Sequence, residues 1–373
     1  MKKAISKRRK MVKSVAIVVF AVVLAFGIFT AFAAYRMSLI PSMTFQEMLK
    51  YTTKDNKDAI ITVGIIKGTS MSYTVYGENG TILPSKEYTY EIGSATKTFT
   101  CSLLCKAISE GRVELTDSIE KYISLPETES IYYPTFRKLV THTSGYKGYY
   151  FNRQMISNFL HGQKNDFYGI GVETLKKQIS KHIVKDKEYP FNYSNFGISV
   201  VGIALSNIYN KDYASVMNDF ITSDLGLEHT KISDSSGDLK GYWNWKSDDG
   251  YIPAGAIKST IGDMLKYVNL HMTKGIPYLA LGHQEVAEIN ATKKQYEKMN
   301  IRMDAAGIGW MIDKQNNIIW HNGGTSNFNS YIAFDPKNQV SVVILSNLSP
   351  NYRIPVTVMG ARLILDLQSK EIN

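Results

Sequence analysis

The sequence predicts an α+β fold, in which one antiparallel sheet is assembled from both ends of the chain, flanked by helices, and carries an inserted, mostly helical subdomain. Two strand-like runs occur early, at 59–67 (AIITVGIIK) and 71–76, before a turn at 77–80. Four more begin at residue 307 and read GIGWMID, NNIIWH, NSYIAFD and QVSVVILSN. Between the two groups, apolar residues recur at helical spacing, as at 95–109, 198–209 and 261–272, and a last helical run covers 354–367.

An uncharged, apolar stretch of 21 residues at 15–35 precedes all of these elements. As a helix it would extend about 31 Å, enough to cross the hydrocarbon core of a bilayer. Seven basic residues lie before it, so we expect residues 1–14 to stay in the cytoplasm and the rest of the chain to lie outside. The alternative is a secreted protein, because Ala31-Phe32-Ala33 fits a signal-peptide cleavage site.

The chain therefore divides into a basic N-terminus (1–14), a single-pass transmembrane anchor (15–35), a polar connector (36–56) and a folded domain (57–373). Within that domain we expect sheet segments at about 57–110 and 301–373, and the helical insertion at about 111–300. This arrangement makes two regions in space that are not two independent halves in sequence.

Charge and cysteine content exclude several functions. The net charge is +10, but the seven basic residues before position 15 leave only +3 for the rest of the chain. A nearly neutral domain is a poor ligand for phosphate backbones, so no nucleic-acid partner is expected. Cys101 and Cys105 are the only cysteines, and no metal-binding motif is present. We expect both to be buried thiols, with no metal and no cofactor.

Serine acyl-transfer chemistry needs an activated hydroxyl, a base and donors for the oxyanion. The pattern S-x-x-K occurs three times, beginning at Ser94, Ser118 and Ser144. Only Ser94 follows a predicted strand and starts a predicted helix, which places Lys97 one turn away on the same face. A lysine facing into a packed helix loses hydration, which favours the neutral amine that acts as a base. The interpretation without function is a helix cap at Ser94 and a surface lysine at Lys97.

Five segments in order, IGSATKTFT, LVTHTSGY, YSNFG, IPAG and HNGGTSNFNSYIAFDP, resemble the serine β-lactamase-related hydrolases of the penicillin-binding-protein superfamily. That group includes class C β-lactamases and DD-carboxypeptidases. The resemblance covers about 57–367 and implies a β-lactamase/transpeptidase-like fold.

The resemblance also implies a role for each matching residue. Ser94 is then the acylated nucleophile and Lys97 its proton acceptor. Tyr193 relays the proton to the leaving group, as a phenolate if a neighbouring ammonium favours that form. Asn195 holds Lys97 and the acyl side chain of the substrate. The backbone N–H groups of Ser94 and Gly324 form the oxyanion hole.

The segment beginning at His321 departs from the family pattern. Many relatives have Lys-Thr-Gly or Lys-Ser-Gly where this chain has His321, Asn322 and Gly323. A histidine is mostly neutral near pH 7, so we expect weak recognition of a substrate carboxylate. Asn322 offers an amide in place of the hydroxyl. Gly323 and Gly324 allow the substrate to lie directly along the strand edge.

These observations predict a serine hydrolase that acts on D-alanyl groups of the cell envelope, as a D-Ala-D-Ala carboxypeptidase or a D-alanyl esterase. The alternatives are a class C-like β-lactamase and a non-catalytic, penicillin-binding sensor or wall-interaction module. The expected partners are a cell-envelope D-alanyl substrate or a β-lactam, and the membrane; we expect a monomer. Trp243 and Trp245 belong either to a substrate-binding loop or to ordinary packing.

Overall fold

The computed structural model describes residues 38–125 and 131–369 of the chain. Contacts divide the protein into two units, 1–44 and 45–373, and every strand of the described residues lies in the second unit. The expected anchor at 15–35 lies outside the described residues. Among the described residues, no helix combines the length and apolarity needed to cross a bilayer.

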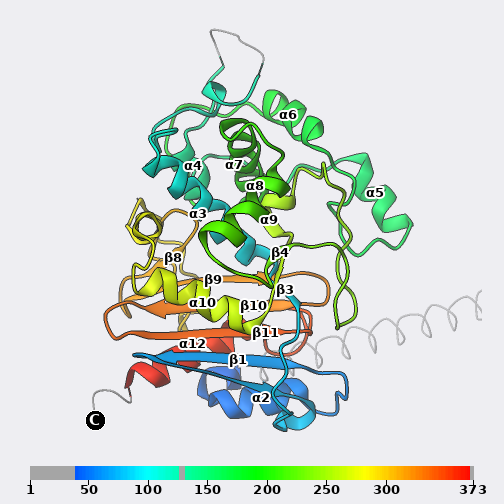
Figure 1. Ribbon diagram of the computed structural model, residues 1–373, viewed down its shortest axis with the longest axis vertical. Helices are drawn as coiled ribbons and strands as arrows, with labels where there is room; N and C mark the ends of the chain where they lie inside the picture. The colour runs from blue at the N-terminus through cyan, green and yellow to red at the C-terminus, as the bar shows by residue number, and fades with distance from the viewer. Residues whose placement is uncertain (1–37, 126–130, 370–373) are drawn as a thin grey trace, which may run out of the picture. The chain divides into compact units, whose positions relative to one another are not determined.

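An eight-stranded antiparallel sheet forms the centre of the second unit (Figure 1). In spatial order its strands are β2 (Ser70–Tyr76), β1 (Ile61–Lys67), β11 (Val340–Ser346), β10 (Asn329–Asp335), β9 (Ile318–Gly324), β8 (Met311–Asp313), β7 (Ala305–Ala306) and β6 (Ala287–Glu288). The N-terminal hairpin pairs with the C-terminal strands through β1 and β11, with Ile61 opposite Ser346. The predicted antiparallel sheet from the two chain ends is thus confirmed.

Helices cover both faces of this sheet. The C-terminal helix α12 (Val356–Ser369) contacts β10 and β11 and also α2 (Phe45–Thr53). On the opposite face, α10 (Ile261–Met272) lies against β1, β10 and β11. All seven residues of β10 and of β11 are buried because the central strands are covered from both sides.

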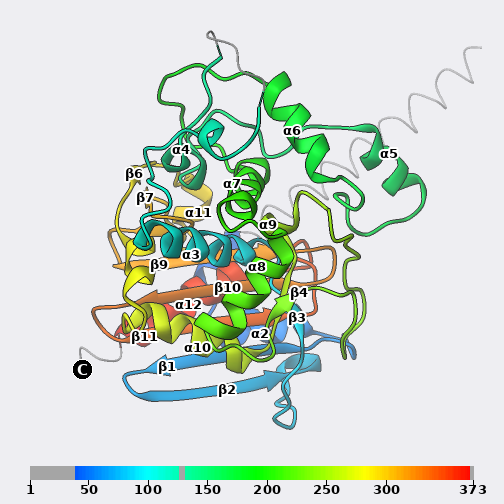
Figure 2. The ribbon, with the colours of Figure 1, turned by 45° about the horizontal axis from the view of Figure 1, so that its top comes forward.

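The remaining helices gather beside the sheet (Figure 2). They are α3 (Thr96–Ser109), α4 (Phe136–Val140), α5 (Arg153–Leu160), α6 (Val172–Lys181), α7 (Asn195–Ile208), α8 (Tyr213–Asp219), α9 (Ile252–Gly255) and α11 (Lys294–Glu297). A small sheet of β3 (Tyr90–Glu91), β5 (Ile257–Ser259) and β4 (Lys231–Ile232) lies with them. The range 111–300 is not purely the helical insertion, because it also supplies β6, the edge strand of the large sheet, and α10, which covers one face of that sheet.

Short helical turns connect these elements: η1 (Ile40–Ser42), η2 (Glu78–Gly80), η3 (Gly93–Ala95), η4 (Ile119–Lys121), η5 (Phe220–Asp224) and η6 (Pro277–His283). The buried helix α3 is central, with contacts to α7, α8 and α9. Cys101 and Cys105 lie within it as buried free thiols. Such all-round burial explains why the apolar periodicity of this segment is weak.

Candidate active site

Ser94 lies in the turn η3, directly before α3, and Lys97 occupies the first turn of α3. The Lys97 side chain is fully buried, and its Nζ lies 3.0 Å from Ser94 Oγ. Burial lowers the pKa of Lys97 to about 7, because a charged ammonium loses its hydration there. A substantial fraction of Lys97 is therefore neutral near pH 7 and able to accept the Ser94 proton.

A backbone carbonyl from a distant segment fixes Lys97. Its Nζ donates to the oxygen of Ala254, in α9, at 2.6 Å. Helix α9 is itself attached to α3, since Thr100 Oγ1 donates to the Pro253 carbonyl at 2.6 Å. Ala254 belongs to the IPAG segment, one of the five motifs that carry the family resemblance, but the sequence did not predict a role for its carbonyl.

Tyr193 comes from the segment before α7 and reaches Ser94 through a side-chain hydrogen bond. The Lys97 Nζ lies 5.1 Å from the centre of its ring. Burial raises the pKa of Tyr193, and the hydrogen bond with Ser94 only partly offsets this effect. The structure therefore argues against a phenolate, and Tyr193 is a neutral phenol that can give and take a proton.

Two glycines, Gly323 on β9 and Gly93 in the turn η3, let the strand pass against the nucleophile turn. A Cβ on Gly323 would lie 1.9 Å from the Ile92 oxygen and 2.8 Å from the Ser94 nitrogen. Gly93 has φ of +51°, and a Cβ there would lie 2.5 Å from the Gly324 nitrogen. No side chain fits at either position.

The direction of the Gly324 N–H follows from the strand pairing. The Thr325 N–H donates to the Phe328 oxygen within the β9–β10 hairpin. Backbone groups alternate along an antiparallel strand, so the N–H of the preceding Gly324 points to the opposite edge, toward the Ser94 turn. The backbone N–H groups of Ser94 and Gly324 can thus converge on one oxyanion.

His321 projects from β9 toward Tyr193, with ring centres 6.2 Å apart. Its Nδ1 lies 2.6 Å from the Asn322 carbonyl oxygen, and because a carbonyl only accepts, Nδ1 carries the proton. Burial and then the charge of Lys97 lower the pKa of His321 to about 3. Its buried Nε2 has no hydrogen-bond partner among the described residues. His321 therefore offers the site a neutral acceptor.

Two of the expected substrate contacts take other positions. Asn322 points to the face of β9 opposite His321, where its Nδ2 donates to Thr357 Oγ1 of α12 at 3.0 Å. Asn195 begins α7, and within the described residues its side chain makes no hydrogen bond to Lys97. The Ala254 carbonyl takes that role. Asn195 is partly exposed and remains available to a substrate.

His142 packs against Tyr193 and binds the backbone of the next residue. Its ring lies 4.6 Å from the Tyr193 ring, and its Nδ1 accepts a hydrogen bond from the Ser194 N–H at 3.1 Å. Its φ of +59° is a left-handed conformation in which non-glycine residues are uncommon. His142 is thus a positioning residue for the Tyr193 segment.

The other two S-x-x-K copies form no comparable pair. Ser118 Oγ donates to the Tyr133 carbonyl at 3.1 Å, while Lys121 pairs with Asp117. Ser144 is buried, but the side chain of Lys147 is exposed. Only the first copy therefore brings hydroxyl and amine together.

Comparisons with known proteins agree with this geometry. The profile of the family described as Beta-lactamase matches residues 62–358. This chain belongs to the Beta-lactamase family. Protein flp of Staphylococcus aureus strain MW2 is 23% identical over 292 residues, which are 70% of this chain and 53% of that protein. The chain thus spans about half the length of this curated relative.

Two further relatives match this chain over a larger part of their own length. The D-alanyl-D-alanine-carboxypeptidase/endopeptidase AmpH of Escherichia coli is 24% identical over 313 residues, covering 77% of this chain and 78% of the relative. The structure of a beta-lactamase/D-alanine carboxypeptidase from Yersinia pestis superposes with a TM-score of 0.65 at 19% identity, covering 91% and 99% of the two chains. The Beta-lactamase family fold is thereby confirmed.

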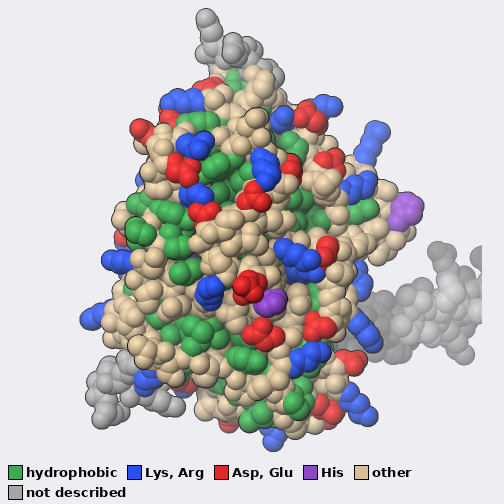
Figure 3. Space-filling model, viewed as in Figure 1, with side chains coloured by type: hydrophobic (Ala, Val, Ile, Leu, Met, Phe, Trp, Pro, Cys, Tyr) green, Lys and Arg blue, Asp and Glu red, His purple; other side chains and the backbone are tan. Residues whose placement is uncertain are grey.

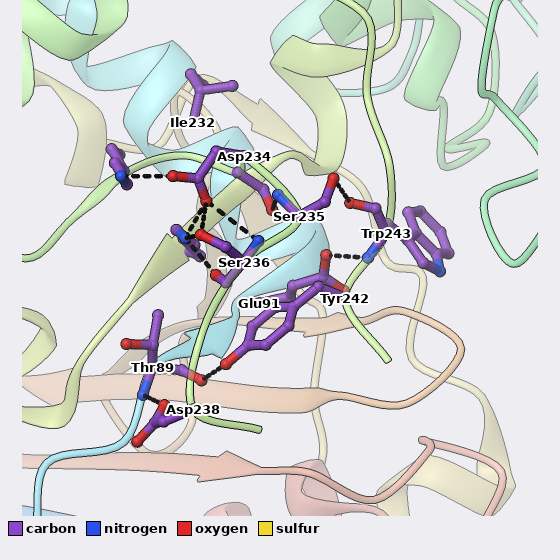
Figure 4. Close-up of polar contacts among 12 residues, drawn as sticks. Thr89, Glu91, Ile232, Asp234, Ser235, Ser236, Asp238, Tyr242 and Trp243 are labelled. Atoms are coloured by element: carbon purple, nitrogen blue, oxygen red, sulfur yellow. Dashed lines mark hydrogen bonds and ion pairs between the residues drawn. The ribbon is translucent and has the colours of Figure 1, made fainter. Parts of the chain in front are cut away.

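The segment 233–243 of this Beta-lactamase-family domain lies against β3 (Figure 4). The Trp243 N–H donates to Glu91 Oε1 at 2.6 Å, and the Tyr242 hydroxyl donates to the Thr89 carbonyl at 2.6 Å. The indole N–H of Trp243 also donates to Ser326 Oγ, in the β9–β10 turn, at 3.1 Å. Trp243 therefore joins this segment to the turn that follows Gly324.

Proposed function

We propose that this protein is a membrane-anchored, extracytoplasmic serine hydrolase that removes D-alanyl groups of the cell envelope through an acyl-enzyme. The observation that carries the proposal is the 3.0 Å contact between Lys97 Nζ and Ser94 Oγ, in a site that lowers the pKa of Lys97 to about 7. We also propose that it acts as a monomer, because Ser94, Lys97 and Tyr193 can contact one another within a single chain.

In the acylation step the neutral Lys97 amine takes the Ser94 proton while Ser94 Oγ attacks the substrate carbonyl. The backbone N–H groups of Ser94 and Gly324 stabilise the developing oxyanion. The Tyr193 phenol gives its proton to the leaving group and regains one from Lys97. Water then cleaves the acyl-enzyme with the same groups acting in reverse.

The chemistry at His321 favours substrates without a carboxylate next to the scissile bond. The pKa of about 3 leaves the imidazole neutral, and Nε2 is an acceptor that repels a carboxylate lone pair. A leaving group with a hydroxyl or an amine can instead donate to Nε2. Among D-alanyl substrates, an ester on a polyol fits this acceptor better than a D-Ala-D-Ala terminus.

Support for the D-alanyl class comes from the family, whose members include the E. coli carboxypeptidase/endopeptidase described above. Support for the location comes from the 21 uncharged residues at 15–35 and the seven basic residues before them. Protease added to intact cells should digest the catalytic domain and leave a small N-terminal fragment. A domain that is protected until lysis would contradict the proposed topology.

The substrate proposal is tested with the full chain in detergent, against a D-alanyl ester, a D-Ala-D-Ala peptide, a chromogenic cephalosporin and a short acyl ester. We expect turnover of the D-alanyl ester at least equal to that of the peptide, and no turnover by Ser94→Ala. A kcat/KM for the cephalosporin near 10⁶ M⁻¹s⁻¹, within the ~10⁴–10⁸ range of efficient enzymes, would instead establish the β-lactamase function.

A further inference from the structure

Exposed apolar side chains concentrate in one segment next to the active site. Ten large hydrophobic side chains of the described residues are exposed, and six of them lie within 149–183. They are Tyr149, Phe151, Ile156, Phe159, Leu160 and Ile183. Phe159 is the most exposed of the ten, at 80%. Scattered exposed hydrophobic residues are ordinary, but such a concentration marks an interaction surface.

The helix α5 places its apolar side chains outward. Successive residues of a helix are 100° apart, so Ile156, Phe159 and Leu160 share one face, and all three are exposed. The inward face holds Met155 and Asn158. Asn158 fixes the helix by donating to the Tyr168 carbonyl at 2.8 Å. A surface helix normally shows the reverse arrangement. We call the exposed Arg153, Ile156, Phe159 and Leu160, with Phe151 before them, the α5 face.

The segment that carries the α5 face is rich in basic residues. The range 147–188 holds eight lysines and arginines and four acidic residues, a net charge of +4. The whole chain after residue 14 carries only +3, so this range accounts for more than all of its excess. Lysine and arginine side chains project from the surface where α5 and α6 lie (Figure 3). The surface is therefore both apolar and positive.

We propose that the α5 face seats in the headgroup region of an anionic lipid bilayer. Apolar side chains on one helix face, ringed by lysine and arginine, insert at the boundary between headgroups and acyl chains. Each basic residue near an anionic surface adds to the attraction between the protein and the bilayer. The apolar face and the positive charge of its segment together favour a lipid surface over a second copy of this chain, which would bring like charges together.

Hydrogen bonds link the segment that carries the α5 face to the catalytic site. Ser326 Oγ, in the β9–β10 turn, donates to the Lys164 carbonyl at 2.8 Å. Before α5 in the chain, the Gly148 carbonyl accepts a hydrogen bond from the Phe196 N–H in α7, and Phe196 is three residues after Tyr193. Docking of the α5 face therefore holds the catalytic site at a fixed orientation to the lipid surface, beyond what a tether at the N-terminus does.

The experiment uses the full chain reconstituted in phosphatidylcholine vesicles with and without phosphatidylglycerol. An environment-sensitive fluorophore is attached at Phe159→Cys, and nitroxide-labelled lipid serves as the quencher. The matched control is Ile82→Cys, whose side chain is 73% exposed and lies outside the segment. Both variants must still acylate at Ser94, which shows that each is folded. The native Cys101 and Cys105 are buried and do not react.

In vesicles that contain phosphatidylglycerol, we expect the nitroxide lipid to quench more than half of the fluorescence of the label at position 159. The fluorescence of the label at position 82 should change little. High salt, or the double variant Arg153→Glu, Lys164→Glu, should restore the fluorescence. Equal quenching at the two positions, or none at 159, would overturn the proposal. A shift in the emission of the label at 159 that follows protein concentration, without quenching by the nitroxide lipid, would assign the face to a second copy instead.

Discussion

Lys97 Nζ donates a hydrogen bond to the Ala254 carbonyl at 2.6 Å, across 157 residues of sequence. This contact aligns the base. A carbonyl only accepts, so it binds an N–H of the amine and leaves the nitrogen lone pair of neutral Lys97 free to face Ser94 Oγ, 3.0 Å away. The same contact would also hold the ammonium once the proton has moved.

An acylating probe should modify Ser94 alone. A fluorophosphonate or a fluorescent penicillin is expected to form one covalent adduct, and mass mapping should place it on the peptide that contains Ser94. The variant Ser94→Ala should lose the adduct, whereas Ser118→Ala should keep it. The Ser118 hydroxyl donates its hydrogen bond to the Tyr133 carbonyl, which cannot act as a base toward it. An adduct that persists in Ser94→Ala would disprove the nucleophile.

The acylation rate should follow the ionisation of Lys97. Its pKa is lowered to about 7, so the base is protonated below that pH and free above it. With a neutral ester as substrate, kcat/KM should rise about tenfold per pH unit below pH 7 and level off above it. The variant His321→Gln should keep this midpoint, since the pKa of His321 is about 3. A midpoint that disappears in that variant would make His321 the base.

Replacing Lys97 should stabilise the fold while abolishing activity. Between the folded pKa of about 7 and the unfolded value of ~10.4, the unfolded state holds a proton that the folded state lacks, so stability rises with pH through this window. Below pH 7 the full penalty applies, on the order of 5 kcal/mol. Lys97→Met removes that penalty but leaves the Ala254 carbonyl unpaired, at a cost of about 1–3 kcal/mol.

Urea denaturation at pH 6 and pH 9 measures this difference. Lys97→Met should be more stable than the wild type at pH 6, and the gap should narrow at pH 9. A gap that does not depend on pH would mean that Lys97 carries no lowered pKa in the folded protein.

The contact between β9 and the nucleophile turn should not tolerate a single methyl group. In Gly323→Ala the new Cβ would lie 1.9 Å from the Ile92 oxygen, which forces the turn and the strand apart. Loss of the aligned oxyanion donors lowers kcat by about 100- to 1000-fold. Gly255→Ala is the matched control, because its Cβ would meet nothing within 4 Å. If both variants keep wild-type kcat, the oxyanion site has been placed wrongly.

A cation in place of His321 should change substrate preference. His321→Lys offers an ammonium where the wild type has a neutral acceptor, and a charge-assisted hydrogen bond contributes roughly 1.5–3 kcal/mol. The ratio of kcat/KM for a D-Ala-D-Ala peptide to that for a D-alanyl ester should therefore rise about 10- to 150-fold. The pH midpoint is measured in parallel, because a second cation can lower the pKa of Lys97 further. An unchanged ratio with an unchanged midpoint would exclude His321 from recognition.

Local patterns in the sequence predicted the elements that carry the site. The spacing of Ser94 and Lys97 is local, so a helix start at this point was enough to bring them onto one face. The strand runs after residue 307 predicted β9 to β11, because buried strands are rich in apolar residues over seven or more positions. The order of five short motifs identified the family, which the profile match over 62–358 confirms.

Long-range contacts decided the rest. The sequence by itself identified the family and predicted the nucleophile and its base. It did not show that Ala254, rather than Asn195, holds Lys97, that Asn322 turns to α12, or that Tyr193 stays a phenol. The Lys97 contact depends on which distant backbone carbonyl approaches it. The direction of Asn322 depends on the alternation of side chains along a paired strand, and the protonation of Tyr193 depends on burial. Such properties arise only when segments far apart in sequence pack together, because hydration and hydrogen-bond partners are set by the neighbours in space.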